Sequence, residues 1–323
     1  MTEGHSVPIP PLELRSLVGL ADAREFENPD RTPIFASYGV GLDSYESVFD
    51  FGCGCGRLAR QLLLQDPKPR RYVGIDVHKG LIDWCTSNLT QINPSFEFFH
   101  HDVYSPTYAR GNSLQLAQPF PVRHGEVSLV IANSIFTHLS RQQAEYYLSE
   151  VARILSPTGI AFTTWLLFDR ASFPFLADVY CLHTSETDFS QAVLFDREWL
   201  LGTIRNLGLG IRSTRPPTVP GHQWRLLLAR RTPDMVDDFP LGEVGADWVS
   251  GATLKPMATS TDMPGAPRTR PVPRIGSATP GRPPLFGPLA EVEQIKRSWS
   301  WRVGRAVTSP IRTIRTLFRK VVR

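Results

Sequence analysis

The chain has 323 residues, of which 41% are hydrophobic and 20% charged, and its net charge is +4. That composition supports a sizeable core. The sequence has no apolar run of the ~18 residues that a membrane span needs, and its N-terminus has no signal-peptide pattern. Its cysteines show neither a disulfide framework nor a zinc-type spacing. The lack of a membrane span and of a signal pattern leads us to expect a cytoplasmic protein. Residues 296–323 hold nine basic residues and no acidic one, which leaves residues 1–295 at a net charge of −5. We therefore expect that residues 1–295 do not form a nucleic-acid-binding surface.

The N-terminal segment, residues 1–45, is weakly patterned. Its apolar positions between Leu12 and Leu20 predict one short amphipathic helix. Two placements stay open for this helix, as a lid over a binding site or as ordinary packing against the rest of the fold.

A glycine-rich turn follows the first predicted strand. The apolar run Val48–Phe51 leads into Gly52, Gly54 and Gly56, and an apolar helical pattern begins at Leu58. Glycine tolerates positive φ and lets a ligand approach the backbone at the start of a helix, so this corner is typical of a nucleotide-type site. The third glycine comes one position too early for the dinucleotide fingerprint G-x-G-x-x-G.

Strand and helix patterns alternate from here to residue 166. The predicted strands are 72–76, 96–100, 125–133 and 160–166; the predicted helices are 57–65, one beginning near Leu81 and one capped by Ser140. This alternation predicts an α/β fold, a doubly wound and mostly parallel sheet with ligands at the C-terminal strand ends. Asp76, at such an end, suits the two hydroxyls of a ribose.

The remaining sequence divides into four parts. Residues 167–195 have no regular pattern and are interpreted as an insertion that shapes a substrate pocket. Asp196 caps a helix, and strands 210–215 and 223–230 form an antiparallel hairpin. Residues 232–288 hold eleven of the 28 prolines and predict a disordered linker, and 289–323 form the basic tail.

Four phrases in the chain carry a family resemblance. They are the D-x-G-x-G-x-G pattern from Asp50 to Gly56, Val73–Asp76, Ser134–Leu139 and Glu150–Gly159. Together they resemble the class I S-adenosylmethionine (SAM)-dependent methyltransferases, which implies a seven-stranded sheet over residues 46–231 and SAM as cofactor. The resemblance implies a cofactor-binding set of Asp50, Gly52, Cys53, Gly54, Gly56, Asp76, Val77, Asp102, Val103 and Asn133.

The sequence gives less information about the methyl acceptor than about the cofactor. An [ND]-P-P-[YFW] motif would mark amino-directed nucleic-acid methylation, and the chain has Asn133-Ser134-Ile135-Phe136 instead. We therefore expect transfer to oxygen on a small molecule or glycan. His138, His222 and Asp169 are candidates for a general base, each with a structural alternative, namely packing, a hairpin turn and a surface ion pair. Two rival functions stay open, a non-catalytic SAM-binding module and a nucleic-acid methyltransferase.

The basic tail predicts an amphipathic helix that begins at Ser309-Pro310. Its apolar stripe and basic face suit an anionic membrane surface, such as the inner face of the cell membrane, or a protein partner. Its motifs Arg297–Arg302 and Thr308–Arg312 resemble a C-terminal tail of bacterial glycosyltransferases and surface-polysaccharide enzymes. This resemblance implies a role in polysaccharide synthesis.

Overall fold

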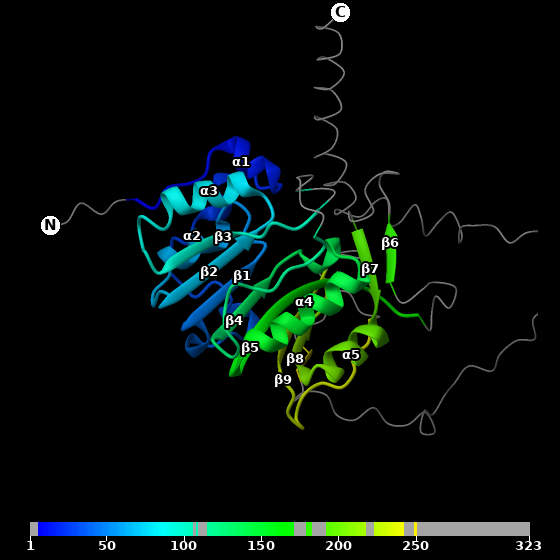
Figure 1. The fold of residues 1–323 in the computed structure, drawn as a ribbon. Coiled ribbons are helices and arrows are strands. Elements are labelled where there is room, and N and C mark those ends of the chain that lie inside the picture. The colour runs from blue at the N-terminus through cyan, green and yellow to red at the C-terminus, as the bar shows by residue number, and fades with distance from the viewer. Residues whose placement is uncertain are drawn as a thin grey trace, which may run out of the picture.

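A central sheet organises the fold (Figure 1). The computed structural model describes residues 6–105, 108, 115–170, 179–182, 192–217, 223–241 and 249–250. Seven strands lie in the order β8-β9-β5-β4-β1-β2-β3. They are β1 (Ser47–Phe51), β2 (Arg71–Asp76), β3 (Phe96–His100), β4 (Val127–Ala132), β5 (Leu155–Phe168), β8 (Leu209–Arg215) and β9 (Trp224–Arg230).

Five of these strands are parallel, and β9 runs antiparallel to both β5 and β8. The chain builds β1, β2 and β3 outward on one side and then returns to place β4 beside β1. The strand order therefore reverses between β1 and β4, where open parallel sheets form a ligand crevice at the C-terminal ends of their strands. The predicted mostly parallel sheet with a C-terminal antiparallel hairpin is confirmed.

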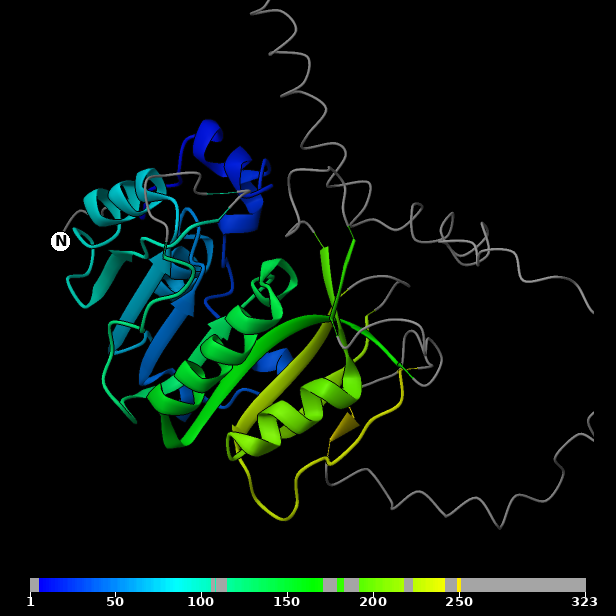
Figure 2. The ribbon, with the colours of Figure 1, turned by 45° about the vertical axis from the view of Figure 1, so that its right-hand side comes forward.

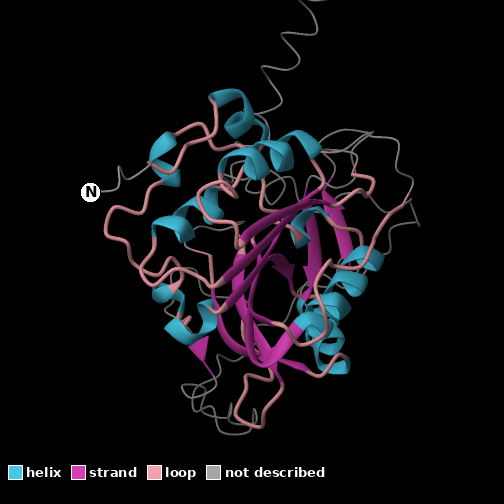
Figure 3. Cartoon of the chain, turned by 60° about the vertical axis from the view of Figure 1, so that its left-hand side comes forward, coloured by secondary structure: helices cyan, strands magenta, loops and turns pink. Residues whose placement is uncertain are grey.

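Helices cover both faces of the sheet (Figure 3). The α-helices are α1 (Leu12–Leu17), α2 (Arg57–Leu64), α3 (Lys79–Asn88), α4 (Arg141–Ile154) and α5 (Arg197–Asn206). Alternate residues of a strand enter different cores: Val48 packs in the cluster of α2 and α3, whereas Phe49 packs in the cluster of α4 and α5. None of the helices in the described ranges is long and apolar enough to cross a membrane.

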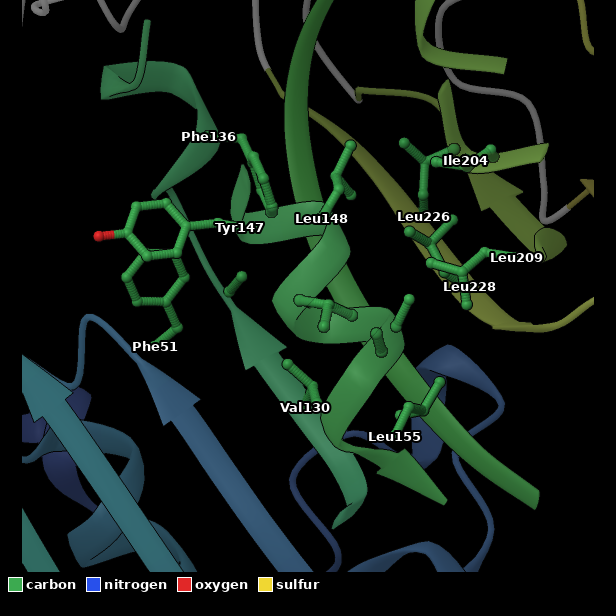
Figure 4. Packing of buried hydrophobic residues seen from close by; sticks show 14 of the residues in the cluster. Phe51, Val130, Phe136, Tyr147, Leu148, Leu155, Ile204, Leu209, Leu226 and Leu228 are labelled. Carbon is green, nitrogen blue, oxygen red and sulfur yellow. The ribbon is translucent and has the colours of Figure 1, made fainter. Parts of the chain in front are cut away.

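The core beneath α4 is the larger of the two clusters (Figure 4). Ser140 caps this helix through a reciprocal capping box with Gln143, which fixes where it starts. Tyr147 and Leu148 point from α4 toward the sheet, and the ring of Tyr147 lies against Phe51 with centroids 4.6 Å apart. The end of β1 is thereby held against α4, next to the glycine turn.

The N-terminal segment packs over that turn, with α1 beside α3 (Figure 1). Three short 3-10 helices complete it, namely η1 (Ala23–Phe26), η2 (Ala36–Tyr38) and η3 (Leu42–Tyr45). The Arg60 side chain, on α2, is 6% exposed and donates to the Val7, Pro8 and Phe26 carbonyls. One buried guanidinium therefore fixes both ends of the loop that carries α1.

Two predictions about irregular segments differ from the structure. Residues 167–195 include two short strands, β6 (Val179–Leu182) and β7 (Ala192–Asp196), and β7 runs parallel to the end of β5 (Figure 2). The apolar run Ala192–Phe195 explains this strand, because Val193 and Phe195 are buried.

The expected linker also begins later than residue 232. Val236 and Phe239 are each 2% exposed, Val236 pairs with Ile211, and Phe239 packs on Trp224. A short strand β10 (Val249–Ser250) pairs with β8. The two apolar side chains anchor residues 232–241 to the sheet despite the high proline content nearby; the rest of the expected linker, apart from β10, and the tail 289–323 lie outside the described residues.

Candidate functional site

A cavity of about 640 Å³ lies at the C-terminal ends of β1, β2 and β4. Most residues of the predicted cofactor set line it, together with one predicted base. These are Asp50, Gly52, Cys53, Gly54, Asp76, Val77, Val103, Asn133 and His138. Two walls can be distinguished. We name them after the roles expected from the sequence: residues 50–55 and 75–78 are called the cofactor wall, and residues 133–143 with Tyr108 and Val193 are called the acceptor wall.

Each of the three positions in the turn requires glycine for a different physical reason. A Cβ on Gly52 would lie 2.0 Å from Cδ1 of Ile135, in the segment that follows β4, and one on Gly54 would lie 3.2 Å from Cγ1 of Val18. Gly56 does not line the cavity; a Cβ there would lie 2.7 Å from Leu89, on the α3 side. All three have positive φ, so the turn needs glycine for conformation as well as for space.

Asp76 ties the two loops of the cofactor wall together. Its Oδ2 accepts the Gly54 N–H at 2.9 Å, and its Oδ1 accepts the His78 N–H at 2.8 Å. Burial raises the pKa of the Asp76 carboxyl, while those two N–H donors oppose the rise. Each carboxylate oxygen keeps a further lone pair, so Asp76 retains acceptor capacity toward a ligand in the cavity. The α3 cap is His78 and not Asp76.

Asp50 lies beneath the glycine turn and is 1% exposed. The Tyr72 hydroxyl donates to its Oδ2 at 2.7 Å. Burial raises the pKa of Asp50 to about 7, and the bond from Tyr72 opposes this rise. Burial likewise raises the pKa values of the Cys53 and Cys55 thiols, so both are neutral packing groups.

The acceptor wall is assembled from distant segments. Ser134 follows β4 with φ of 60°, a conformation that is rare for a residue with a side chain. Its N–H donates to the Thr164 hydroxyl at 2.7 Å, and its hydroxyl donates to Gln223 at 3.1 Å. Contacts from β5 and from the residue before β9 thus hold the turn that leads to His138.

His138 ends the 3-10 helix η4 (Phe136–His138) and faces the cavity. Its half-buried ring meets the ring of Tyr108 edge-on, with centroids 5.6 Å apart. Of the other two predicted bases, only Asp169 lies within the described residues. Asp169 does not line the cavity and pairs with Arg197 at 3.5 Å, and His222 lies outside the described residues.

Asp102 also departs from the predicted set. It is exposed and does not line the cavity, whereas its neighbours His101 and Val103 are buried and do. The chain alternates at the end of β3, so the side chain that enters the fold at this point is that of His101.

Sequence reasoning missed His101 and its partners. The ring is 2% exposed; its Nε2 lies 2.8 Å from the Tyr147 hydroxyl and its Nδ1 lies 3.0 Å from Nε2 of Gln118. The Gln118 amide is a donor, so Nδ1 accepts and Nε2 carries the hydrogen. Burial lowers the pKa of His101 to about 4, which keeps the ring neutral. The periodicity of the helix that Ser140 caps gives no sign of the histidine, because His101 lies on a different segment.

Comparison with known families supports the interpretation of the cavity. Residues 48–159 match a family model described as a methyltransferase domain. The chain carries a SAM-dependent methyltransferase domain. The match begins in β1 and ends within the first part of β5, so it includes both walls of the cavity except Val193.

Solved structures of similar fold include several methyltransferases. A SAM-dependent methyltransferase from Methanosarcina mazei has 12% identity and a TM-score of 0.40 over 61% of this chain and 96% of its own. An O-methyltransferase family protein from Burkholderia thailandensis has 17% identity and a TM-score of 0.41 over 61% and 55%. An O-methyltransferase of neocarzinostatin biosynthesis, with SAM bound, has 13% identity and a TM-score of 0.41 over 61% and 52%. The chain spans about half the length of the last two.

The residues of the methyltransferase domain fit its cofactor, SAM. Gly52 and Gly54 line the cavity with backbone that carries no side chain, and the buried carboxylate of Asp76 lines the same cavity. These are the features that a nucleoside with an attached amino acid needs, namely close backbone approach and an acceptor for ribose hydroxyls. Among the described residues, no cluster of three or more metal-ligating side chains is placed to hold a metal ion.

Proposed function

We propose that this domain transfers a methyl group from SAM to an oxygen atom of a small-molecule or glycan acceptor. One observation carries the proposal: a single cavity joins the cofactor wall to an acceptor wall that contains a histidine. The volume of about 640 Å³ falls in the usual range for small-molecule sites. The residues after β4, Asn133-Ser134-Ile135-Phe136, favour an acceptor other than a nucleic-acid amino group.

The chemistry asks more for positioning than for activation, because SAM supplies a methyl group that is already activated toward displacement. The cofactor wall would hold the ribose at Asp76 and pass the rest of the molecule over Gly52 and Gly54. The acceptor wall would then align a hydroxyl for in-line attack.

His138 is our candidate for the group that removes the hydroxyl proton. It lies on the acceptor wall, and a neutral imidazole is the side chain best matched to proton transfer near pH 7. His222 stays a second candidate, because Gln223 beside it in the sequence reaches Ser134 on the same wall. Asp169 is the weakest candidate, since it is paired with Arg197 away from the cavity.

The test is turnover of SAM with a panel of acceptors that carry hydroxyl, carboxyl or amino groups, including sugars. We expect product with one hydroxyl acceptor class and none with RNA. Tight SAM binding without turnover on any acceptor would favour the rival function, a non-catalytic SAM-binding module.

We also propose that the basic tail anchors the domain to an anionic membrane, and that the domain takes part in polysaccharide synthesis there. The support is in the sequence: nine basic residues in 296–323 stand beside a body of net charge −5. Each basic residue near such a surface contributes roughly 1 kcal/mol, screened by salt. In a flotation assay with anionic liposomes, the full-length protein should float and a truncation after Ser250 should not. Equal flotation of the two would overturn the anchor.

That truncation point follows from the fold. Cutting at residue 231 would remove Val236 and Phe239, which are buried against the sheet, and the strand β10 that pairs with β8. A truncation after Ser250 keeps them and separates loss of the tail from damage to the domain.

A further inference from the structure

Two arginines share one tyrosine ring at the C-terminal edge of the sheet. The Arg215 guanidinium carbon lies 5.5 Å from the ring centroid of Tyr38, and that of Arg225 lies 6.0 Å from it. Arg215 and Arg225 are direct cross-strand partners in the antiparallel pair β8–β9, so their side chains leave the same face. Like charges directly opposite each other destabilise a sheet.

The Tyr38 ring orients the Arg225 guanidinium but leaves its charge in place, because a cation–π contact contributes only the attraction of the ring quadrupole. The half-buried Arg225 makes no ion pair and no hydrogen bond with any described residue. Arg230, at the other end of β9, differs, because it donates to the Leu155 carbonyl at 3.0 Å. Arg225 therefore keeps its donors available to an anion.

This arginine pair does not line the cavity of the methyltransferase domain, but a short series of contacts connects Arg225 to it. Arg225 lies opposite Thr164 of β5, whose hydroxyl accepts the N–H of Ser134, and Ser134 lines the cavity. Gln223, two residues before Arg225 and on the same face, accepts from the Ser134 hydroxyl. Thr164 and Gln223 thus connect the neighbourhood of Arg225 to Ser134 on the acceptor wall.

We propose that Arg215 and Arg225, held by Tyr38, form an anion-binding site for a phosphate or carboxylate group of the methyl acceptor. Guanidinium groups suit this role because their planar forks bind such groups through two parallel hydrogen bonds. The proposal rests on the proposed function in one respect, that the acceptor enters beside Ser134. It narrows the acceptor to an acidic molecule, such as one that carries a diphosphate or a carboxyl group.

The experiment is calorimetric titration of the full-length protein with pyrophosphate and, separately, with succinate, in moderate salt. Arg225→Gln should weaken the binding of at least one probe about tenfold or more, the effect of a lost charge-assisted pair. Arg212→Gln is the matched control, since Arg212 is an exposed arginine of β8, the strand that carries Arg215, and its loss removes the same charge. The basic tail contributes a background that all variants share.

The outcomes separate this site from the rest of the protein. A loss in Arg225→Gln alone supports the site, and the probe that is affected tells phosphate from carboxylate. Equal losses in Arg225→Gln and Arg212→Gln would mean diffuse attraction and would overturn it, as would no binding of either probe by the wild type. A loss of SAM affinity in Arg225→Gln would give the arginines to the cofactor instead. Failure of the proposed function would appear separately, as wild-type protein without SAM turnover.

Discussion

The two walls of the cavity are built in different ways. The cofactor wall is held by the Asp76 carboxylate, which accepts the backbone N–H groups of Gly54, in the neighbouring loop, and of His78, two residues further along its own loop. In the acceptor wall, two side chains fix the turn at Ser134. They are Thr164 and Gln223, which lie 30 and 89 residues after Ser134 in the chain. We therefore expect the cofactor wall to bind SAM in one fixed geometry, and the acceptor wall to determine which acceptor is bound.

The largest effect on SAM binding should come from a substitution where the two walls of the cavity are in contact, at Gly52 and Ile135. In Gly52→Val the new Cβ would lie 2.0 Å from Cδ1 of Ile135, and a β-branched residue would be strained at φ of 80°. Ile135 could give way only into the cavity that it lines. We expect SAM binding to fall by roughly a hundredfold or more, as measured by calorimetry, since strain and lost space act together.

Gly202→Val is its control. Gly202 lies in α5, and a Cβ there would have no neighbour within 4 Å. This variant should keep wild-type SAM affinity. If Gly52→Val binds SAM equally well, the glycine turn is not the cofactor seat.

The same contrast explains what the sequence could predict. Strand ends, glycine spacing and the cap at Ser140 are local signals, and the structure has strands, helices and the cofactor wall where those signals lie. Asp102 failed as a cavity residue because alternation at the end of β3 turns His101 inward in its place.

Contacts between distant segments have no such local signal. Gln118 reaches His101, and Gln223 reaches Ser134, through side chains whose partners depend on the completed fold. The burial of Val236 and Phe239 was hidden for a related reason: two anchoring side chains are too few to change the composition of a proline-rich stretch.

The second prediction addresses the acceptor wall alone. If His138 removes the acceptor proton, His138→Gln should lower turnover about 10²–10⁴-fold, the usual contribution of a general base. SAM affinity should stay within about twofold, because His138 lies away from the hydrogen bonds of the cofactor wall. His124→Gln, at an exposed position, is the control. Full turnover in His138→Gln would leave His222 or positioning alone to account for the rate.

The third prediction uses two buried groups that titrate in opposite senses. His101 has its pKa lowered to about 4 by burial, so below pH ~6.5 the unfolded chain binds a proton that the folded protein does not, and stability rises with pH. Asp50 has its pKa raised to about 7 by burial, so the folded protein keeps a proton that the unfolded chain releases, and stability falls as pH rises from ~4 to 7.

These two contributions should largely cancel in the wild type. His101→Gln should leave a stability that falls between pH 4.5 and 6.5, and Asp50→Asn should leave one that rises, each by up to about 3 kcal/mol. Urea unfolding of the three proteins at several pH values measures the slopes. Parallel slopes in all three proteins would show that neither group is buried in the protonation state described here.

The smallest effect should come from Asp76→Asn, which changes one atom of the cofactor wall. The amide keeps one acceptor oxygen, so either Gly54 or His78 loses the partner of its N–H, and a ribose loses its charged acceptor. Charge-assisted hydrogen bonds contribute ~1.5–3 kcal/mol, so SAM affinity should fall by about an order of magnitude. Asp83→Asn, an exposed position on α3 that pairs with Lys79, is the matched control and should bind SAM normally. With saturating SAM, Asp76→Asn should recover near-normal turnover, whereas His138→Gln should not. If Asp76→Asn instead lowers turnover at saturating SAM and leaves affinity unchanged, the division of the cavity into a cofactor wall and an acceptor wall is wrong.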